Sequence, residues 1–178
     1  MEAPAGTTLV VVGEEATTAI RSLEGLANVR SATFADASDD DVARWEATSS
    51  APYLVHDHDP LAHVAAAWVE FFDDQSTYGV LELEIERAVE AVERHAISVP
   101  DYYVVVHPET LPVTWKHWWL GVLAVASPNR VIPWARPDDS LARLLRRLPT
   151  ARAWPEVEPW LRGVTAAVPD RVGLGGAA

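Results

Sequence analysis

The chain of 178 residues contains no cysteine, which excludes disulfides, thiolate metal ligands and cysteine nucleophiles. Lys116 is the single lysine against thirteen arginines, so almost every candidate for lysine chemistry is also missing. No apolar run reaches the roughly 18 to 20 residues that cross a bilayer, and the N-terminus lacks the basic segment that opens a signal peptide. We therefore expect a cytoplasmic protein that makes no membrane contact.

Three glycine-dependent motifs are absent as well. The sequence has no GxxxxGK[ST] phosphate loop, no GxGxxG dinucleotide turn and no GxSxG nucleophile elbow. These absences argue against nucleotide kinases, dinucleotide dehydrogenases and α/β-hydrolases.

The net charge of −12 is unevenly distributed. Residues 1–110 carry a net charge of −16 and residues 111–178 a net charge of +4. An acidic surface disfavours nonspecific binding to nucleic acid, because that binding depends on cations that neutralise phosphates. The asymmetry fits either a basic protein partner that docks on the N-terminal part, or solubility combined with internal charge complementarity.

Short apolar runs rich in β-branched or aromatic residues predict five strands, at 7–12, 29–34, 53–55, 102–106 and 130–134. Apolar spacing of three to four residues predicts helices between and after them, at 14–27, 38–49, 60–72, 80–95, 112–125, 138–148 and 155–168. Residues 80–95 begin with a period-two run that also fits a strand, and helix is favoured. Ser38, and Asp138 to Ser140, are the predicted N-caps of their helices.

Strand and helix alternate five times without an internal repeat or a dividing linker. This order predicts an α/β fold: a single doubly wound, mostly parallel five-stranded sheet, Rossmann-like or flavodoxin-like, with helices on both faces. The last helices form a helical C-terminal extension. We expect one domain over residues 1–170 and a loose tail over 171–178.

Ligands of such folds bind outside the carboxyl ends of the strands. Glu14 follows the first predicted strand, Asp57 and Asp59 follow the third, and His107 follows the fourth. Carboxylates grouped with imidazole suit a divalent ion such as Mg, Mn or Zn. The sequence thus predicts Asp57, Asp59 and Glu14 as metal ligands, and Asp57 and His107 as catalytic residues, with His107 as general base or ligand.

A structural role for the same residues stays open. Asp59 with Pro60 would cap the next helix, Asp57 would meet a backbone amide, and His107 would be a hydrogen-bonded histidine at a strand end. Any role of His56, His58 and His63 is left undecided.

The run Asp57-His58-Asp59-Pro60, together with an acidic residue after the first strand, resembles the Toprim domain of primases, topoisomerases and related nucleases. The resemblance implies metal binding by Asp57 and Asp59 and an acid–base role for Glu14. It covers only these short stretches, and Glu14 follows Gly13 here, whereas the family places its glutamate before glycine.

The segment 112–125 is apolar on nearly all sides, and Trp115, Trp118 and Trp119 lie within it. A helix without a polar face is either buried or docked against a partner. The three tryptophans are therefore candidates for the core, or for a protein interface, where tryptophan is enriched.

Two functions follow from these patterns, and the sequence does not decide whether the protein is an enzyme. The first is a divalent-metal or nucleotide/phosphoester ligand site at the carboxyl ends of the strands. The alternative is a non-enzymatic acidic interaction module, of an immunity or regulatory type, that uses the Trp-rich helix.

Overall fold

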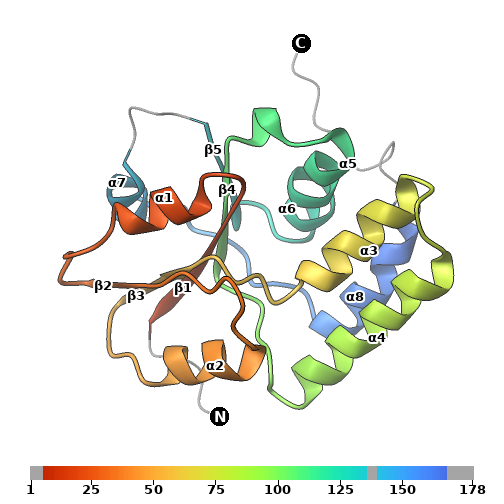
Figure 1. Ribbon diagram of the computed structural model, residues 1–178, viewed down its shortest axis with the longest axis horizontal. Coiled ribbons are helices and arrows are strands. Elements are labelled where there is room, and N and C mark those ends of the chain that lie inside the picture. The colour runs from red at the N-terminus through yellow and green to blue at the C-terminus, as the bar shows by residue number, and fades with distance from the viewer. Residues whose placement is uncertain (1–5, 136–139, 168–178) are drawn as a thin grey trace.

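The computed structural model describes residues 6–135 and 140–167. Its centre is a parallel five-stranded sheet of order β2-β3-β1-β4-β5 (Figure 1), which confirms the predicted α/β class. Relative to the 3-2-1-4-5 order of the dinucleotide-binding fold, β2 and β3 exchange places. The strands are β1 (Thr7–Val12), β2 (Val29–Ser31), β3 (Tyr53–His56), β4 (Tyr102–Val106) and β5 (Val131–Trp134).

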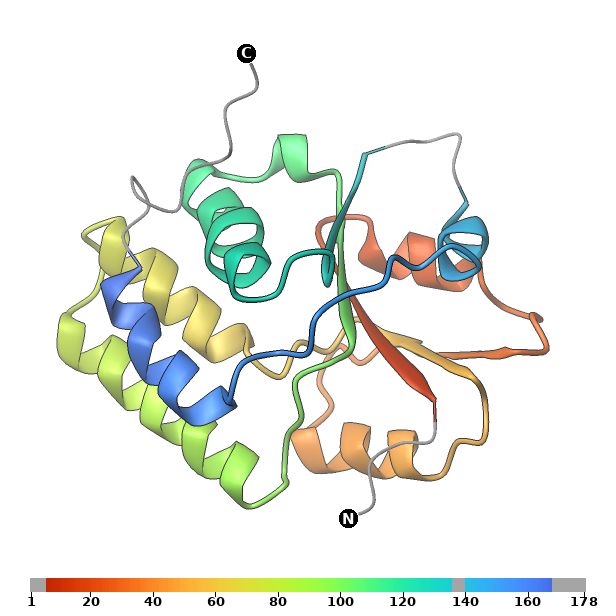
Figure 2. The same ribbon diagram turned by 180° about the vertical axis from the view of Figure 1, so that it is seen from behind.

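Helices cover both faces of the sheet. One face packs against α1 (Ala16–Arg21) and α7 (Leu141–Leu145). The figures show α2 on the opposite side of the sheet from α1 (Figures 1 and 2). The helices α3, α4 and α8 pack together as a group beside the sheet. The remaining helices are α2 (Asp39–Ala47), α3 (Ala62–Phe72), α4 (Tyr78–Glu93), α5 (Val113–Lys116), α6 (Ala124–Ala126) and α8 (Val157–Gly163).

The central strands are buried on both faces, as their unbroken apolar runs predict. In β1, Leu9 and Val11 face α1 and α7, whereas Val10 faces the other layer. The parallel register places Val10 of β1 beside His56 of β3. His56 therefore points from the same face as Val10, toward α2.

Several predicted elements differ in length from the observed ones. The helix expected over 14–27 is only α1, because the chain continues in turns after Arg21, and the strand expected over 29–34 ends at Ser31. The segment 80–95 is helical, as favoured, and α4 already begins at Tyr78. The predicted helix over 112–125 is continuous from α5 to α6, but its middle, His117–Leu123, has π-helical hydrogen bonding.

Two predicted helix caps can be compared with the structure. Ser38 forms a capping box with Asp41 at the start of α2. Ser140 accepts a hydrogen bond from the backbone of Arg143, whereas Asp138 and Asp139 lie outside the described residues.

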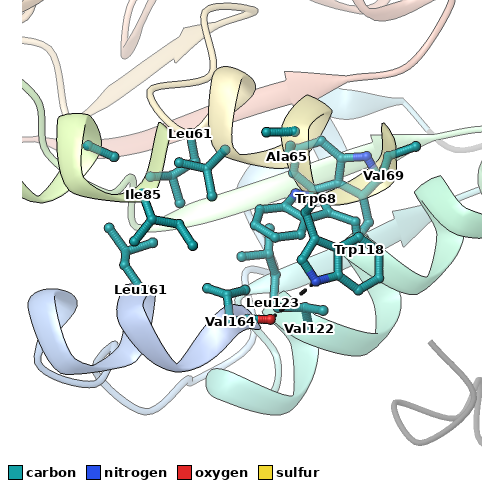
Figure 3. Close-up of a cluster of buried hydrophobic side chains, with 14 of the residues drawn as sticks. Leu61, Ala65, Trp68, Val69, Ile85, Trp118, Val122, Leu123, Leu161 and Val164 are labelled. Carbon is teal, nitrogen blue, oxygen red and sulfur yellow. Dashed lines mark hydrogen bonds between the residues drawn. The ribbon is translucent and has the colours of Figure 1, made fainter. Parts of the chain in front are cut away.

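The C-terminal extension belongs to the core. The α8 residue Leu161 is fully buried, and Val164 lies in the short 3-10 helix η3 (Val164–Ala166) that follows α8. Figure 3 shows Trp68 of α3 beside Trp118, with its indole N–H donating to the carbonyl oxygen of Val164 at 3.2 Å. The predicted tail over 171–178 lies outside the described residues. Among the described helices, none is both long enough and apolar enough to cross a membrane.

Candidate ligand cavity

The two predicted metal-binding aspartates have separate protein partners. Oδ1 of Asp57 accepts a hydrogen bond from the backbone N–H of Phe34 at 2.6 Å, which ties the end of β3 to the segment after β2. Oδ1 of Asp59 accepts from the backbone N–H of Leu61 at 3.0 Å and from the hydroxyl of Tyr103 at 2.9 Å. The Asp57 contact is the amide contact of the structural alternative, whereas Asp59 does not cap α3, whose N-cap Leu61 makes no side-chain cap hydrogen bond.

The predicted metal ligands do not converge on one ion. Glu14 is exposed, and the described residues contain no group of three or more His, Asp or Glu side chains that could hold a metal ion. The donors expected from the Toprim resemblance therefore do not form such a group.

The Asp59 carboxyl group is in an unusual electrostatic environment. Burial raises the pKa of Asp59 to about 6, although the hydrogen bonds from Leu61 and Tyr103 act in the opposite direction. Burial likewise raises the pKa of Tyr103 well above its usual value, and the nearby Asp59 carboxylate adds to this shift. The pair joins the segment after β3 to β4 across the intervening strand β1.

His107 lies at the carboxyl end of β4, at the point where the chain leaves the neighbouring strands β1 and β4 toward opposite sides of the sheet. Its backbone is left-handed, with φ of 48°. Its Nδ1 is 3.1 Å from Oε1 of Glu109. Its Nε2 is 3.4 Å from Oε2 of Glu15, the residue after the predicted Glu14. The hydrogen bond with Glu109 is the main reason that the pKa of His107 is raised.

The tryptophans considered for an interface lie mainly inside the protein. Trp118 is fully buried, Trp119 is 5% exposed, and Trp115 is partly buried against the same core cluster. Trp119 packs on Tyr103 with ring centroids 5.3 Å apart. Trp118 and Trp119 therefore present no surface to a partner of the folded chain.

A cavity of about 320 Å³ lies between α2 and the segment 95–100, over the sheet face of β1 and β3. We call it the α2 cavity. Apolar side chains form most of its wall, and its polar side chains include two acidic residues and three histidines. Its lining residues are Val10, Asp39, Val42, Ala43, Glu46, Ala47, His56, His58, Pro60, His95, Ala96, Ile97, Ser98 and Pro100.

Two histidine–carboxylate pairs connect α2 to the end of β3. Nε2 of His56 is 3.1 Å from Oε1 of Glu46, and Nε2 of His58 is 2.7 Å from Oδ1 of Asp39. The partners match in spacing: the carboxylates lie two helical turns apart on one face of α2, and the histidines alternate along an extended chain.

His56 is the most enclosed member of these pairs, with a side chain that is 2% exposed. Phe34 and Trp45 pack edge-on against its ring, both with centroids 5.8 Å away. Its second ring nitrogen, Nδ1, is buried and has no hydrogen-bond partner within the described chain. The pair with Glu46 thus leaves half of the imidazole's hydrogen-bonding capacity unused.

His95 reaches the cavity from the other side through the end of α4. Its N–H bonds to the carbonyl of Val92, and the N–H of Ala96 bonds to the carbonyl of Ala91, the hydrogen-bond pattern of a Schellman motif. The motif requires a left-handed residue at this position, and His95 takes it with φ of 57°, where glycine is more usual. This turn directs the segment 95–100 across the cavity.

A second cavity of about 270 Å³ adjoins the first. The two share Asp39, Pro60 and Ile97, and the second extends between α3 and α4 to His63 and Arg87. Four of the six histidines of the chain therefore line one or the other cavity. We call the second one the α3–α4 cavity.

Two histidines of the stretch singled out in the sequence, His56 and His58, line the α2 cavity, but the sequence did not indicate their carboxylate partners. Asp39 and Glu46 look like ordinary polar residues of an amphipathic helix, and their match to His58 and His56 exists only once α2 packs on β3. Their spacing of two helical turns was the one signal available, and it also fits a solvated face. No protein-family model, no curated protein and no solved structure matches this chain.

Proposed function

We propose that this protein is a small-molecule binding domain and that its binding site is the α2 cavity. The single observation that supports this proposal most is a largely apolar cavity with a few convergent polar groups, beside the carboxyl end of a strand in a parallel sheet. Cavities of roughly 300 Å³ and above with this kind of lining are typical ligand sites. The proposal keeps the ligand site expected at the strand ends and the cytoplasmic location.

Ligand binding is better supported than metal-dependent phosphoester chemistry. Asp57 and Asp59 each have their own protein partners, and the described residues that line the α2 cavity include neither Arg nor Lys to hold a phosphate. The alternative of an acidic interaction module keeps the acidic surface as support but loses the contribution of Trp118 and Trp119.

The proposal can be tested by filling the cavity. Ala43→Leu and Ala47→Trp add volume at two lining positions of α2, and Ala62→Leu is the control, because Ala62 is exposed on α3 and lines neither cavity. Cyclohexylmethanol and cyclohexylmethylamine are titrated into the ¹⁵N-labelled protein and followed by amide chemical shifts. We expect shifts centred on Ala43, Ala96 and Ile97 that weaken in the two filling variants and persist in the control. Binding that is unchanged by both filling variants would place the ligand elsewhere and refute the proposal.

A further inference from the structure

The polar groups of the α2 cavity are unbalanced in charge. Asp39 and Glu46 are acidic, whereas none of the described residues that line this cavity is Arg or Lys. Glu46 is only 12% exposed, so solvent screens its charge weakly. A ligand that carries a negative charge would meet both carboxylates, whereas the paired histidines are cations only when protonated and no described lining residue is Arg or Lys.

The carboxylate oxygens of the site that are not bonded to a histidine are hydrogen-bond acceptors. Each carboxylate is bonded to its histidine through one oxygen, Oδ1 in Asp39 and Oε1 in Glu46. A ligand with N–H donors complements such a wall, and one that carries only acceptors does not.

The rest of the wall selects for an apolar body. Val42, Ala43, Ala47, Ala96 and Ile97 line the cavity around the two pairs. The apolar part of a ligand would lose its contact with water there, which is the main favourable contribution to binding in sites of this kind. The chemistry of the wall thus calls for an apolar body with one cationic, hydrogen-bond-donating group.

Asp39 gives the position of that group. It is the acidic residue common to both cavities, and its side chain is half exposed at their junction. From the amine at Asp39, the apolar body would extend into the α2 cavity. The α3–α4 cavity, where Arg87 is already paired with Glu84 at 2.5 Å, stays open to a longer substituent on the nitrogen.

We infer that the ligand class of the α2 cavity is an organic amine, protonated at neutral pH, whose N–H donors are held by Asp39, while Glu46, two helical turns away, adds negative charge to the cavity. This inference rests on the proposed function, because it assumes that the cavity binds a small molecule. It adds the charge and the hydrogen-bonding character of that molecule.

Three probes that share one ring test the inference: cyclohexylmethylamine, cyclohexylmethanol and cyclohexanecarboxylate, titrated at pH 7.5 by NMR or calorimetry. Since a hydrogen bond to a charged group contributes roughly 1.5–3 kcal/mol, we expect the amine to bind about tenfold or more tightly than the alcohol. The carboxylate should bind more weakly than either. Added salt should reduce the affinity for the amine and leave the alcohol nearly unaffected.

Variants show whether the preference for the amine comes from the carboxylates of the cavity or from the overall negative charge of the protein. Asp39→Asn should remove most of the preference for the amine and Glu46→Gln a smaller part of it, and both variants should retain binding of the alcohol. Asp40→Asn is the matched control, because Asp40 is exposed, adjacent in sequence and outside both cavities, and it removes the same charge. Circular dichroism of each variant verifies the fold, and the two sites give independent tests if one variant unfolds.

The possible outcomes distinguish the amine inference from the proposed small-molecule binding on which it rests. Equal binding of amine and alcohol, or the same loss of preference in Asp40→Asn as in Asp39→Asn, overturns the assignment of an amine and leaves the cavity as a binding site. Failure of all three probes to shift the cavity amides overturns both.

Discussion

At the scale of single residues, the burial of the Asp59 carboxyl group makes its charged form unfavourable. Its folded pKa of about 6 exceeds the usual value of 3.8 because the carboxyl group is buried. Below about pH 4 the carboxyl is protonated in both the folded and the unfolded chain. Between about pH 4 and 6 the unfolded chain releases its proton first, so stability falls as pH rises, and it levels off above the folded pKa.

The variant Asp59→Asn should remove this pH dependence. The amide keeps an oxygen that accepts from Leu61 and Tyr103, and it carries no charge. The difference between the two pKa values corresponds to about 3 kcal/mol at most, so we expect the variant to be about 1–3 kcal/mol more stable at pH 7. Urea unfolding from pH 4 to 8 measures this. Parallel stability curves for the variant and the parent would contradict it, and Asp40→Asn serves as the control.

His107 is a further residue whose pKa shift has a defined cause. Glu109 and Glu15 raise its pKa, so any stability from these contacts is present below the unfolded pKa and lost as pH rises through the folded one. We expect NMR titration of His107 to show a midpoint above that of an unperturbed histidine, and Glu109→Gln to lower it. Glu14→Gln, which alters a neighbouring carboxylate that forms no ion pair with His107, should leave the midpoint nearly unchanged. An equal effect of both variants would mean that the general acidity of this edge, and not the Glu109 contact, sets the shift.

At the scale of elements, the close approach of β1 and β4 depends on the residue that follows β1. Gly13 has φ of 114°, and a Cβ atom at this position would lie 2.5 Å from the carbonyl oxygen of Val106. Both the backbone conformation and the space require glycine there. The same approach brings His107 and Glu15 within reach of each other.

Gly13→Ala should therefore be strongly destabilising. Strain in the backbone and the clash with Val106 each contribute about 1–3 kcal/mol, so we expect a total loss of roughly 2–6 kcal/mol. Gly79→Ala is the matched control, since a Cβ there meets only Thr77 at 3.9 Å and the residue is helical, which favours alanine by up to about 1 kcal/mol. Chemical denaturation of both variants checks the contrast, and similar losses in the two would contradict the geometric argument.

At the scale of the whole molecule, the C-terminal extension closes the core on the side of α3 and α4. Leu161 is fully buried there, and Trp68 bonds to the carbonyl of Val164. Arg162 makes a two-pronged ion pair with Glu86 of α4, at 2.9 and 3.0 Å. Packing and not charge should dominate, because the ion pair is exposed.

Leu161→Ala should accordingly lower the free energy of unfolding by about 2–5 kcal/mol, the range for a leucine removed from a core. Arg162→Gln should cost clearly less, because its ion pair with Glu86 is exposed to solvent. Urea denaturation of the full chain gives both values in one series. If Arg162→Gln were the more costly change, surface electrostatics would hold the extension in place.

Local patterns were sufficient for much of this architecture. The apolar runs at 7–12 and 102–106 indicate buried strands, the run at 130–134 indicates a further short strand, and Ser38 marks the start of α2. Lengths were harder to predict: α1 stops at Arg21 although apolar spacing continues, because turns and not helix carry the chain to β2. The π-helical middle of the segment 113–126 has no marker in the apolar spacing.

By itself, the sequence determined a parallel α/β sheet covered by helices, since strand and helix periodicity, caps and breaks are properties of neighbouring residues. Only the tertiary structure decided the order of the strands, the burial of Trp118 and Trp119, and the pairing of His56 and His58 with Glu46 and Asp39. Each of these depends on which face of an element packs against a distant one. The cavity exists for the same reason: its walls come from α2, β3 and the segment 95–100, which meet only in the folded chain.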